Sequence, residues 1–378
     1  MKNFPSFVQE LYKTREFVPL HSPIFVGNEK AYLNEAIDST FVSSAGPFVD
    51  LFEEKSAKFL GVTKSVAVVN GTSALQLALR ISGVQANDEV LTQSLSFVAT
   101  ANAINYLGAV PVFIDVDLDT MSLSPEHLRD FLNEYAEIRQ GGCYNKKTGN
   151  KIAACVPMHT FGMMCRIEEI LDLCNEWTIP IVEDAAEAFG SQSNNKYAGS
   201  FGLINAFSFN GNKIITAGGG GLVCSNIESL ANQAKHLSTT AKVKHSWEFF
   251  HDSLGYNFRM PNVNACVALA QLESFSSIVE SKKEIFIKYQ KFFDSSSIKL
   301  INPIDRNLWN HWLFSVCLDN REERDEFLKY TNENAVMTRP IWNLLFKLPM
   351  YQNCFRDDQK NSLYLEERIV NIPSSARL

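Results

Sequence analysis

From about residue 60 to residue 240 the chain alternates short apolar runs with segments whose apolar residues recur every three to four positions. The run 65–70 comes first, and in the segment 72–82 that follows it Leu75 and Leu79 share one stripe. Short apolar runs predict buried strands, and the longer period predicts amphipathic helices between them. Further strands are predicted at 89–93, 110–116, 151–159, 179–185, 206–210 and 221–226, and further helices at 99–108 and 166–177.

This alternation predicts an α/β protein with a mostly parallel sheet that is covered by helices on both faces. The pattern changes after about residue 240. Helical periods dominate 262–294, and two strand-like pieces, 311–318 and 335–342, flank a predicted helix at 321–330. The C-terminal part is therefore predicted to be a smaller α+β domain. The polar, glycine-bearing stretch 140–150 is predicted to be an exposed loop.

Composition narrows the class of protein. The 378 residues are 46% hydrophobic and 20% charged, as expected for a soluble globular chain of two or three domains. A net charge of −7 argues against general nucleic-acid binding, although it permits an anionic small molecule. The absence of a signal-peptide core and of any run of about 18 apolar residues predicts no membrane partner. Eight cysteines without a C-x-x-C pair predict reduced thiols, no metal site and a cytoplasmic location.

The stretch SFNGNKIITAGGGG at 208–221 raises the question of what Lys213 does. A phosphate-binding loop needs a hydroxyl residue after its lysine, but Ile214 follows Lys213. A dinucleotide fingerprint needs a helix after its glycines, but the predicted strand 221–226 follows here. Two alternatives remain open: a lysine that binds a cofactor covalently, or a surface lysine beside a flexible turn.

Polar residues follow several predicted strands at the edge where ligands gather in open α/β sheets. Gly71, Thr72 and Ser73 open a helix, so they form either a phosphate site or an ordinary helix cap. Asp184 ends an apolar run and should be desolvated. It then needs a positive partner, which could be a protonated pyridine nitrogen, a metal or an arginine.

Two more residues complete this set. Ser208 ends a strand five residues before Lys213, and Phe97 begins a helix where it could stack on a flat ring or pack in the core. An anion site, a buried acid, an aromatic ring and a lysine at one sheet edge are the groups that hold pyridoxal phosphate. The phosphate would lie at the helix N-terminus, the ring on the aromatic side chain, the pyridinium nitrogen on Asp184 and the aldehyde on Lys213.

An ordered set of segments that spans nearly the whole chain resembles the DegT/StrS family of pyridoxal-phosphate sugar aminotransferases. These segments are 18–53, NGTSAL (70–75), 96–116, EDAAEAFGS (183–191), 208–221 and LGYNFRM (254–260). The resemblance implies the aspartate-aminotransferase fold, which is fold type I. It implies an N-terminal segment, 1–45, that packs near the active site, a large cofactor-binding domain at 46–250 and a small C-terminal domain at 251–378.

The resemblance also implies roles for individual residues. Lys213 would bind the cofactor covalently and move the proton, and Asp184 would pair with the pyridinium nitrogen. Phe97 would cover one face of the ring. The residues implied in phosphate binding are Thr72, Ser73 and Ser208, with Gly71 allowing close approach.

Two further residues have implied roles that depend on a departure from the family pattern or on a second subunit. Glu187 stands where the family often has glutamine near the ring hydroxyl, so its carboxyl would be protonated or turned away. Asn257 matches an asparagine that reaches the phosphate from the other subunit, which implies a homodimer with shared active sites.

Within the family, the segments 27–46, VPMHTFG (156–162), 339–351 and 365–375 resemble aminotransferases of legionaminic-acid and related pathways. This implies amination at C4 of a UDP- or GDP-linked 4-keto-6-deoxy-N-acetylhexosamine, with L-glutamate as amino donor. His159, Arg339 and Trp342 are candidates for contacting the nucleotide sugar. Each also has a structural explanation, which is in turn a capped strand end, a salt bridge and a core aromatic residue.

Other functions stay open at this point. The substrate could be dTDP-linked or a 3-keto sugar. Some relatives are sugar 3-dehydratases with histidine in place of the lysine, which the presence of Lys213 argues against. A cofactor-binding sensor or regulator without turnover is a further alternative, although neither a helix-turn-helix pattern nor a basic patch supports it.

Overall fold

The computed structural model describes residues 2–294, 296–304 and 307–378. Residue 1 of the predicted N-terminal segment and residues 295, 305 and 306 of the predicted C-terminal domain lie outside this description. The helices are α1 (Phe4–Leu11), α2 (Glu29–Asp38), α3 (Pro47–Leu60), α4 (Gly71–Ile81), α5 (Ala99–Asn105), α6 (Pro125–Tyr135), α7 (Ile167–Glu176), α8 (Glu228–Ser238), α9 (Asn262–Glu273), α10 (Phe275–Phe293), α11 (Arg321–Glu333) and α12 (Lys360–Glu366), with short 3₁₀ turns η1 (Thr160–Gly162) and η2 (Leu345–Lys347). The strands of the large sheet are β1 (Lys64–Val68), β2 (Glu89–Gln93), β3 (Val110–Ile114), β4 (Ala136–Arg139), β5 (Gly142–Asn145), β6 (Lys151–Val156), β9 (Asn205–Ser208) and β10 (Gly221–Ser225).

The large sheet is built around parallel strands. β3, β2 and β6 pair in parallel, and single parallel bridges join Cys155 to Ile181 and Asp184 to both Met158 and Ala206. The segment around Asp184 therefore lies between β6 and β9. The predicted α/β arrangement is confirmed, although 179–185 forms these bridges rather than a continuous strand.

Two of the described strands of this sheet run against both of their neighbours: β5, which pairs with β4 and β6, and β10. β10 is antiparallel to both β9 and β1, so the sheet is mixed. No helix forms in the connection between β9 and β10. A parallel return would need a crossover connection, usually a helix, whereas an antiparallel return does not. The connection that carries Lys213 is therefore a direct turn at the edge of the sheet.

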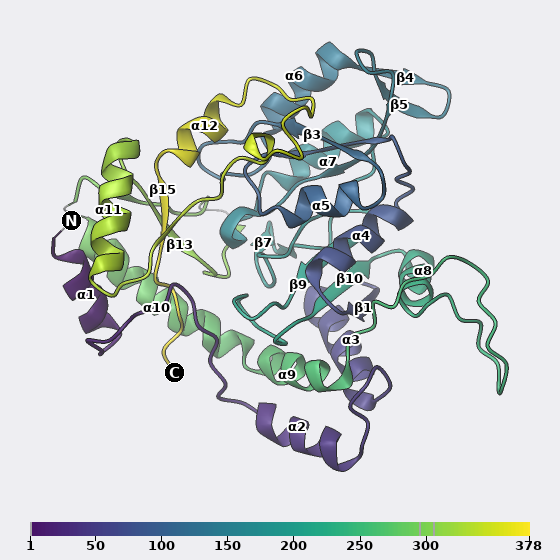
Figure 1. Ribbon diagram of the computed structural model, residues 1–378, viewed down its shortest axis with the longest axis horizontal. Coiled ribbons are helices and arrows are strands. Elements are labelled where there is room, and N and C mark those ends of the chain that lie inside the picture. The colour runs from purple at the N-terminus through teal and green to yellow at the C-terminus, as the bar shows by residue number, and fades with distance from the viewer. Residues whose placement is uncertain (1, 295, 305–306) are drawn as a thin grey trace.

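Side chains of β1 and β2 alternate between two apolar cores, one on each face of the sheet. Val66, Val68 and Val90 belong to one core, while Ala67 and Leu91 belong to the other. Helix α4 packs over β9 and β10 with α5 and α8 beside it, and α3 packs against β1 and α9 (Figure 1). The helices thus cover both faces, as the apolar runs predict.

The segment 140–150, predicted as an exposed loop, contains part of a β-hairpin instead. β4 and β5 pair with each other, and β5 pairs with β6 at the edge of the sheet. Cys143 and Asn145 are buried, and the Asn145 amide nitrogen donates to the Glu89 carboxylate at 2.8 Å. The prediction was wrong because a buried polar residue that is hydrogen-bonded across the sheet looks like a loop residue in sequence.

The C-terminal part forms a second, antiparallel sheet beside α10 and α11. Its order is β11 (Lys299–Leu300), β13 (Phe314–Cys317), β15 (Ile369–Ile372) and β14 (Arg339–Pro340). The short strands β7 (Gln192–Ser193), β8 (Lys196–Tyr197) and β12 (Asn307–Leu308) form a separate small sheet. Among the described residues, no helix is long and apolar enough to cross a membrane.

The N-terminal segment connects the C-terminal part to the large sheet. Helix α1 packs through Phe4, whose ring centroid lies 5.7 Å from that of Phe293 and 5.2 Å from that of Phe327. The chain then bridges Val18 to Val336 and reaches the cavity described below at Leu20. At the opposite end of the molecule, the connection between α8 and α9 extends away from the rest of the chain (Figure 1).

The Phe4 contact can be tested by truncation. Phe4→Ala should lower the free energy of unfolding by about 3–5 kcal/mol, because it opens a cavity among α1, α10 and α11. Urea unfolding measures this loss. Phe17→Ala is the matched control, since Phe17 is 59% exposed and its truncation should change stability by less than about 0.5 kcal/mol. Equal losses in the two variants would contradict the packing described here.

Candidate active site

The carboxyl ends of β1 and β9 and the segment around Asp184 open into a cavity of about 830 Å³. Side chains from the C-terminal part, among them Trp312, Arg324 and Asn371, close its other side. The cavity brings together most of the residues that the sequence singles out. Those that line it are Gly71, Thr72, Phe97, Asp184, Glu187, Ser208, Lys213, Arg339 and Trp342.

One wall of the cavity is the N-terminus of α4. Asn70 caps this helix, because its side-chain oxygen accepts the Ser73 amide hydrogen at 2.8 Å. The cap is therefore neither Thr72 nor Ser73, and Ser73 does not line the cavity. The Gly71 and Thr72 amides have no acceptor within the helix, because no earlier turn of the helix supplies carbonyl oxygens to its first turn. Together with the helix dipole they make this wall suited to an anion.

Gly71 is required by its neighbour at the end of β9. A Cβ atom at this position would lie 2.6 Å from the Ser208 Cβ and 3.2 Å from the Ser208 Cα. Real Cβ atoms do not approach so closely, so a side chain at residue 71 would push α4 away from β9. The missing side chain is what brings the helix N-terminus and the Ser208 hydroxyl to the same anion site.

Asp184 is a buried acid that faces the cavity. Its Oδ2 accepts a hydrogen bond from the Thr100 hydroxyl at 2.7 Å, and its Oδ1 accepts one from the Ala186 amide at 3.2 Å. Within the described residues, neither lysine nor arginine forms an ion pair with it, so the structural-arginine alternative is not observed. A carboxylate held in this way stabilises a cationic group that a ligand brings into the cavity.

Thr100 is a site residue that the sequence analysis missed. It is 1% exposed, it is the second residue of α5, and its hydroxyl also contacts the Ser96 hydroxyl at 2.9 Å. Its place four positions after Ser96, which lies just before α5, is the weak signal that could have indicated contact between the two hydroxyls.

Lys213 points into the cavity rather than into solvent. Its side chain is 13% exposed, its Nζ lies 3.3 Å from Glu187 Oε1, and it lies 4.2 Å from the centroid of the Trp312 ring. The surface-lysine alternative is therefore wrong. Trp312 donates through Nε1 to the Asn212 carbonyl at 2.7 Å, which ties the lysine turn to the C-terminal part. Sequence reasoning missed Trp312 because it lies 100 residues beyond Asn212.

Glu187 turns toward the lysine. Its side chain is 3% exposed, and its Oε2 accepts the Phe161 amide hydrogen at 2.9 Å. Burial raises the pKa of Glu187, and the neighbouring Lys213 and the Phe161 amide only partly offset this effect. The carboxyl thus directly contacts the amine that the sequence analysis identifies as reactive.

Phe97 and the two C-terminal candidates lie at the cavity. Phe97 is 54% exposed there, so the core-packing alternative is wrong for this residue. Arg339 on β14 is exposed, and the Trp342 ring centroid lies 4.9 Å from that of Phe161. Both are accessible to a ligand that enters from the side of the C-terminal sheet.

His159 lies elsewhere, which corrects its prediction as a substrate contact. It is 0% exposed and does not line the cavity. Its Nε2 lies 3.0 Å from Glu183 Oε2, and its Nδ1 accepts the Cys165 amide hydrogen at 3.3 Å. Adjacent residues on an extended segment point to opposite faces. Glu183 and its histidine are therefore buried on one side of the segment while Asp184 faces the cavity on the other.

Asn257 also lies outside the cavity of its own chain. It is exposed, its side-chain oxygen accepts from Arg259 Nε at 3.0 Å, and it pairs with Thr239 near the base of the extended connection between α8 and α9. Its role in the site of a second subunit stays a prediction.

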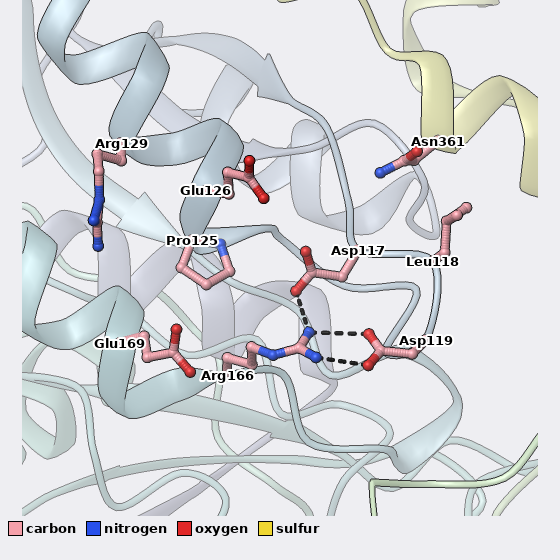
Figure 2. Close-up of a pocket in the computed structure, with 9 residues that line it drawn as sticks. All are labelled: Asp117, Leu118, Asp119, Pro125, Glu126, Arg129, Arg166, Glu169 and Asn361. Carbon is pink, nitrogen blue, oxygen red and sulfur yellow. Dashed lines mark hydrogen bonds and ion pairs between the residues drawn. The ribbon is translucent and has the colours of Figure 1, made fainter.

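A second hollow of about 570 Å³ lies between the start of α6, the start of α7 and the loop after β3 (Figure 2). Arg166 lies in it and donates to Asp119 at 2.9 Å and 2.6 Å and to Asp117. The guanidinium is already paired with these two carboxylates, and none of the sequence-predicted site residues lines the hollow. The chemistry therefore belongs to the larger cavity.

Comparison with known proteins gives consistent matches. The model of the DegT/DnrJ/EryC1/StrS aminotransferase family matches residues 24–378. GDP-perosamine synthase of Escherichia coli O157:H7 is 35% identical over 362 residues, which are 95% of this chain and 93% of that protein. The putative pyridoxal phosphate-dependent aminotransferase EpsN of Bacillus subtilis (strain 168) is 36% identical over 88% of this chain and 83% of its own. The crystal structure of the aminotransferase TlmJ from Streptoalloteichus hindustanus matches with a TM-score of 0.85 and 26% identity, over 95% of this chain and 93% of that one.

The Thr100–Asp184 hydrogen bond yields a prediction. Thr100→Val keeps the shape of the side chain but removes the donor, which leaves a buried carboxylate oxygen without its partner. We expect the free energy of unfolding to fall by about 1–2 kcal/mol in urea unfolding. Thr148→Val, at an exposed turn, should change it by less than about 0.5 kcal/mol. A Thr100 variant as stable as the parent would show that the bond does not hold Asp184.

Proposed function

The chain belongs to the DegT/DnrJ/EryC1/StrS aminotransferase family and is a pyridoxal-phosphate-dependent sugar aminotransferase of fold type I, and from this premise we propose which residues act and which sugar is aminated. The single observation that carries the proposal is the convergence of three groups on one cavity: the α4 N-terminus, Asp184 and Lys213. Each suits a different part of the cofactor, so the residues present fit it.

The N-terminus of α4 would hold the phosphate of the cofactor. The Gly71 and Thr72 amides and the hydroxyls of Thr72 and Ser208 are its donors, supported by the close approach at Gly71. Because the Ser73 amide is already used by Asn70, Ser73 can contribute only through its hydroxyl.

Asp184 and Phe97 hold the ring. Asp184, fixed by Thr100 and the Ala186 amide, keeps the ring nitrogen protonated, and Phe97 covers one face. When bound, pyridoxal phosphate supplies a conjugated, protonated ring that withdraws electrons from the carbon that carries the transferred nitrogen. The task of Asp184 is to maintain the charge on which that electron withdrawal depends.

Lys213 acts twice. It would hold the cofactor through its aldehyde, and its free amine would accept the proton from the amino donor's α-carbon and hold it for return. L-Glutamate is the proposed donor. A nucleotide-linked keto-sugar then enters, and Lys213 moves the proton in the opposite sense. Trp312 contacts the lysine amine through its ring face, 4.2 Å from the ring centroid.

The proposed substrate is a GDP- or UDP-linked 4-keto-6-deoxyhexose that is aminated at C4, with Arg339 and Trp342 contacting the nucleotide sugar. The name of the related GDP-perosamine synthase, which makes a 4-amino sugar, supports this position and favours GDP. The N-acetylated substrate of the legionaminic-acid type stays a prediction that the experiment below tests.

We also infer a cytoplasmic homodimer. Large apolar side chains on the connection between α8 and α9 are exposed, including Trp247 (78%), Phe249 (80%) and Leu254 (78%). A second copy of the chain would cover them, and Asn257 lies near the base of this connection, where it could reach that copy's site. All eight cysteines are free, as in proteins of reducing compartments.

The assignment of Lys213 is tested by Lys213→Ala. The variant should lack the visible absorbance band of the covalently bound cofactor and should lose transamination by about 10⁴-fold or more, because both the bond and the proton carrier are gone. Absorbance spectra and glutamate-dependent turnover measure the two effects. Arg129→Ala, in the second hollow, is the control and should keep both. A Lys213 variant with the band and full turnover would refute the assignment.

The substrate proposal is tested with a panel of 4-keto-6-deoxy sugars linked to GDP, UDP or dTDP, with and without an N-acetyl group, each assayed with L-glutamate. We expect efficient turnover of a GDP- or UDP-linked sugar and formation of a 4-amino product, identified by mass spectrometry and NMR. Turnover confined to a dTDP-linked sugar, or amination at C3, would contradict the proposal.

A further inference from the structure

A buried carboxyl, that of Glu187, lies in direct contact with the amine of Lys213, at 3.3 Å between Oε1 and Nζ. We propose that Glu187 is the proton partner of Lys213: it takes a proton from the ammonium group and leaves the amine free to accept the substrate proton. The inference rests on the proposed role of Lys213 and goes beyond it, because it gives Glu187 a task in proton transfer in addition to its implied place near the cofactor's ring hydroxyl.

The backbone around Glu187 is built to hold this carboxyl. Its Oε2 accepts the Phe161 amide hydrogen at 2.9 Å, and its backbone carbonyl accepts from Asn310 Nδ2 at 2.8 Å. One carboxyl oxygen is thereby fixed, and the other is directed at Lys213. The remaining freedom of the side chain is small, so the contact with the amine does not depend on a chance rotamer.

The turn that supplies the Phe161 amide is strained. Phe161 has φ 56° and ψ 24°, a left-handed conformation that costs a residue with a side chain about 1 kcal/mol or more. Gly162 follows at φ 85°, and a Cβ there would lie 2.2 Å from the Asn310 side-chain oxygen. Trp309 holds the turn in place by donating from Nε1 to the Phe161 carbonyl at 3.0 Å. Strain of this kind persists where the surroundings enforce it, which is common at functional sites.

The charges around Glu187 favour exchange of a proton. Within the described residues, the charged groups facing it are Lys213, from the connection between β9 and β10, and Asp184, from its own segment, while Phe161 and Asn310 contribute neutral donors. Burial raises the pKa of Glu187; Lys213 and the Phe161 amide lower it, and Asp184 raises it further, with a net increase. A carboxyl with a raised pKa is a better proton acceptor than an exposed glutamate.

The proposed step balances without a further reactant. An N–H bond of the Lys213 ammonium breaks, an O–H bond forms at Glu187 Oε1, and the positive and negative charges disappear together. A neutral pair costs less desolvation than an ion pair in a buried site. The lone pair left on Lys213 Nζ then accepts the proton from the substrate carbon. Reversal of the transfer restores both charges.

Glu187→Gln tests the proposal, because glutamine keeps an oxygen for the Phe161 amide but cannot take a proton. The half-reaction of the holoenzyme with L-glutamate is followed by stopped-flow absorbance between pH 5 and 10. We expect its rate to fall by about 10²-fold or more. We also expect the acid limb of the pH profile to move up by about one pH unit or more, since the Lys213 amine must then lose its proton to water.

The sign of that shift follows from the pair. In the parent enzyme activity is lost only at a pH low enough for both groups to be protonated, whereas in Glu187→Gln it is lost as soon as the amine alone is protonated.

A second measurement does not depend on turnover. The pH titration of the cofactor's visible band, without substrate, should move to lower pH, because a neutral amide no longer stabilises positive charge on the lysine nitrogen. Glu10→Gln, on the exposed face of α1, is the matched control and should change neither profile.

Unchanged pH profiles and a half-reaction rate within about twofold of the parent would overturn the proposal. If Glu187→Gln fails to bind the cofactor, Glu187→Asp replaces it. Its carboxyl is retained but withdrawn from Lys213, so a lower rate with the acid limb kept supports the proposal and an unchanged rate overturns it.

The result for Lys213→Ala separates the proposed role of Lys213 from that of Glu187. Loss of the visible band in that variant, together with a normal Glu187→Gln, refutes only the role of Glu187.

Discussion

The site depends on one steric constraint, the approach of Gly71 to Ser208. Helix α4 can begin against the end of β9 only because residue 71 has no side chain, since a Cβ would lie 2.6 Å from that of Ser208. This contact sets the helix N-terminus beside the turn that leads to Lys213, so the proposed phosphate site and the Lys213 amine share one cavity. Packing of α4 over β9 and β10 then fixes both at the same sheet edge.

Three acidic residues are buried near that edge of the sheet, and each has different hydrogen-bond partners. Asp184 is held by two neutral donors and is left without a protein cation among the described residues, which suits it to a cationic ring. Glu187 instead contacts Lys213, so the two acids of one segment serve different groups. Glu183, their neighbour, is satisfied on the opposite face by His159 and by the Gly199, Phe201 and Gly202 amides. Alternation between adjacent residues of the extended segment thus separates Glu183 from Asp184, and Glu187 reaches Lys213 from the turn that follows.

The C-terminal part completes the site through aromatic contacts. Trp312 lies over the Lys213 amine and bonds the turn that carries it, and Trp342 packs on Phe161, whose amide fixes Glu187. The smaller sheet therefore does more than close the cavity, because it also positions the groups around the lysine. The N-terminal segment joins the two parts, from the packing of Phe4 on α10 and α11 to Leu20 at the cavity.

The sequence by itself determined the α/β class and the residues that gather at the strand ends, because these follow from local periodicity and from the fixed direction of parallel strands. The family was indicated separately, by the resemblance of an ordered set of segments. Gly71, Asp184, Ser208 and Lys213 could be found in this way, since each ends a strand, begins a helix or lies in a turn nearby. The tertiary structure decided what local pattern cannot contain. Thr100 and Trp312 reach the site from other elements, Glu187 turns to Lys213, and His159 faces away. Side-chain partners are set by packing between segments far apart in the chain, and one extended residue more or less reverses the face that a side chain occupies.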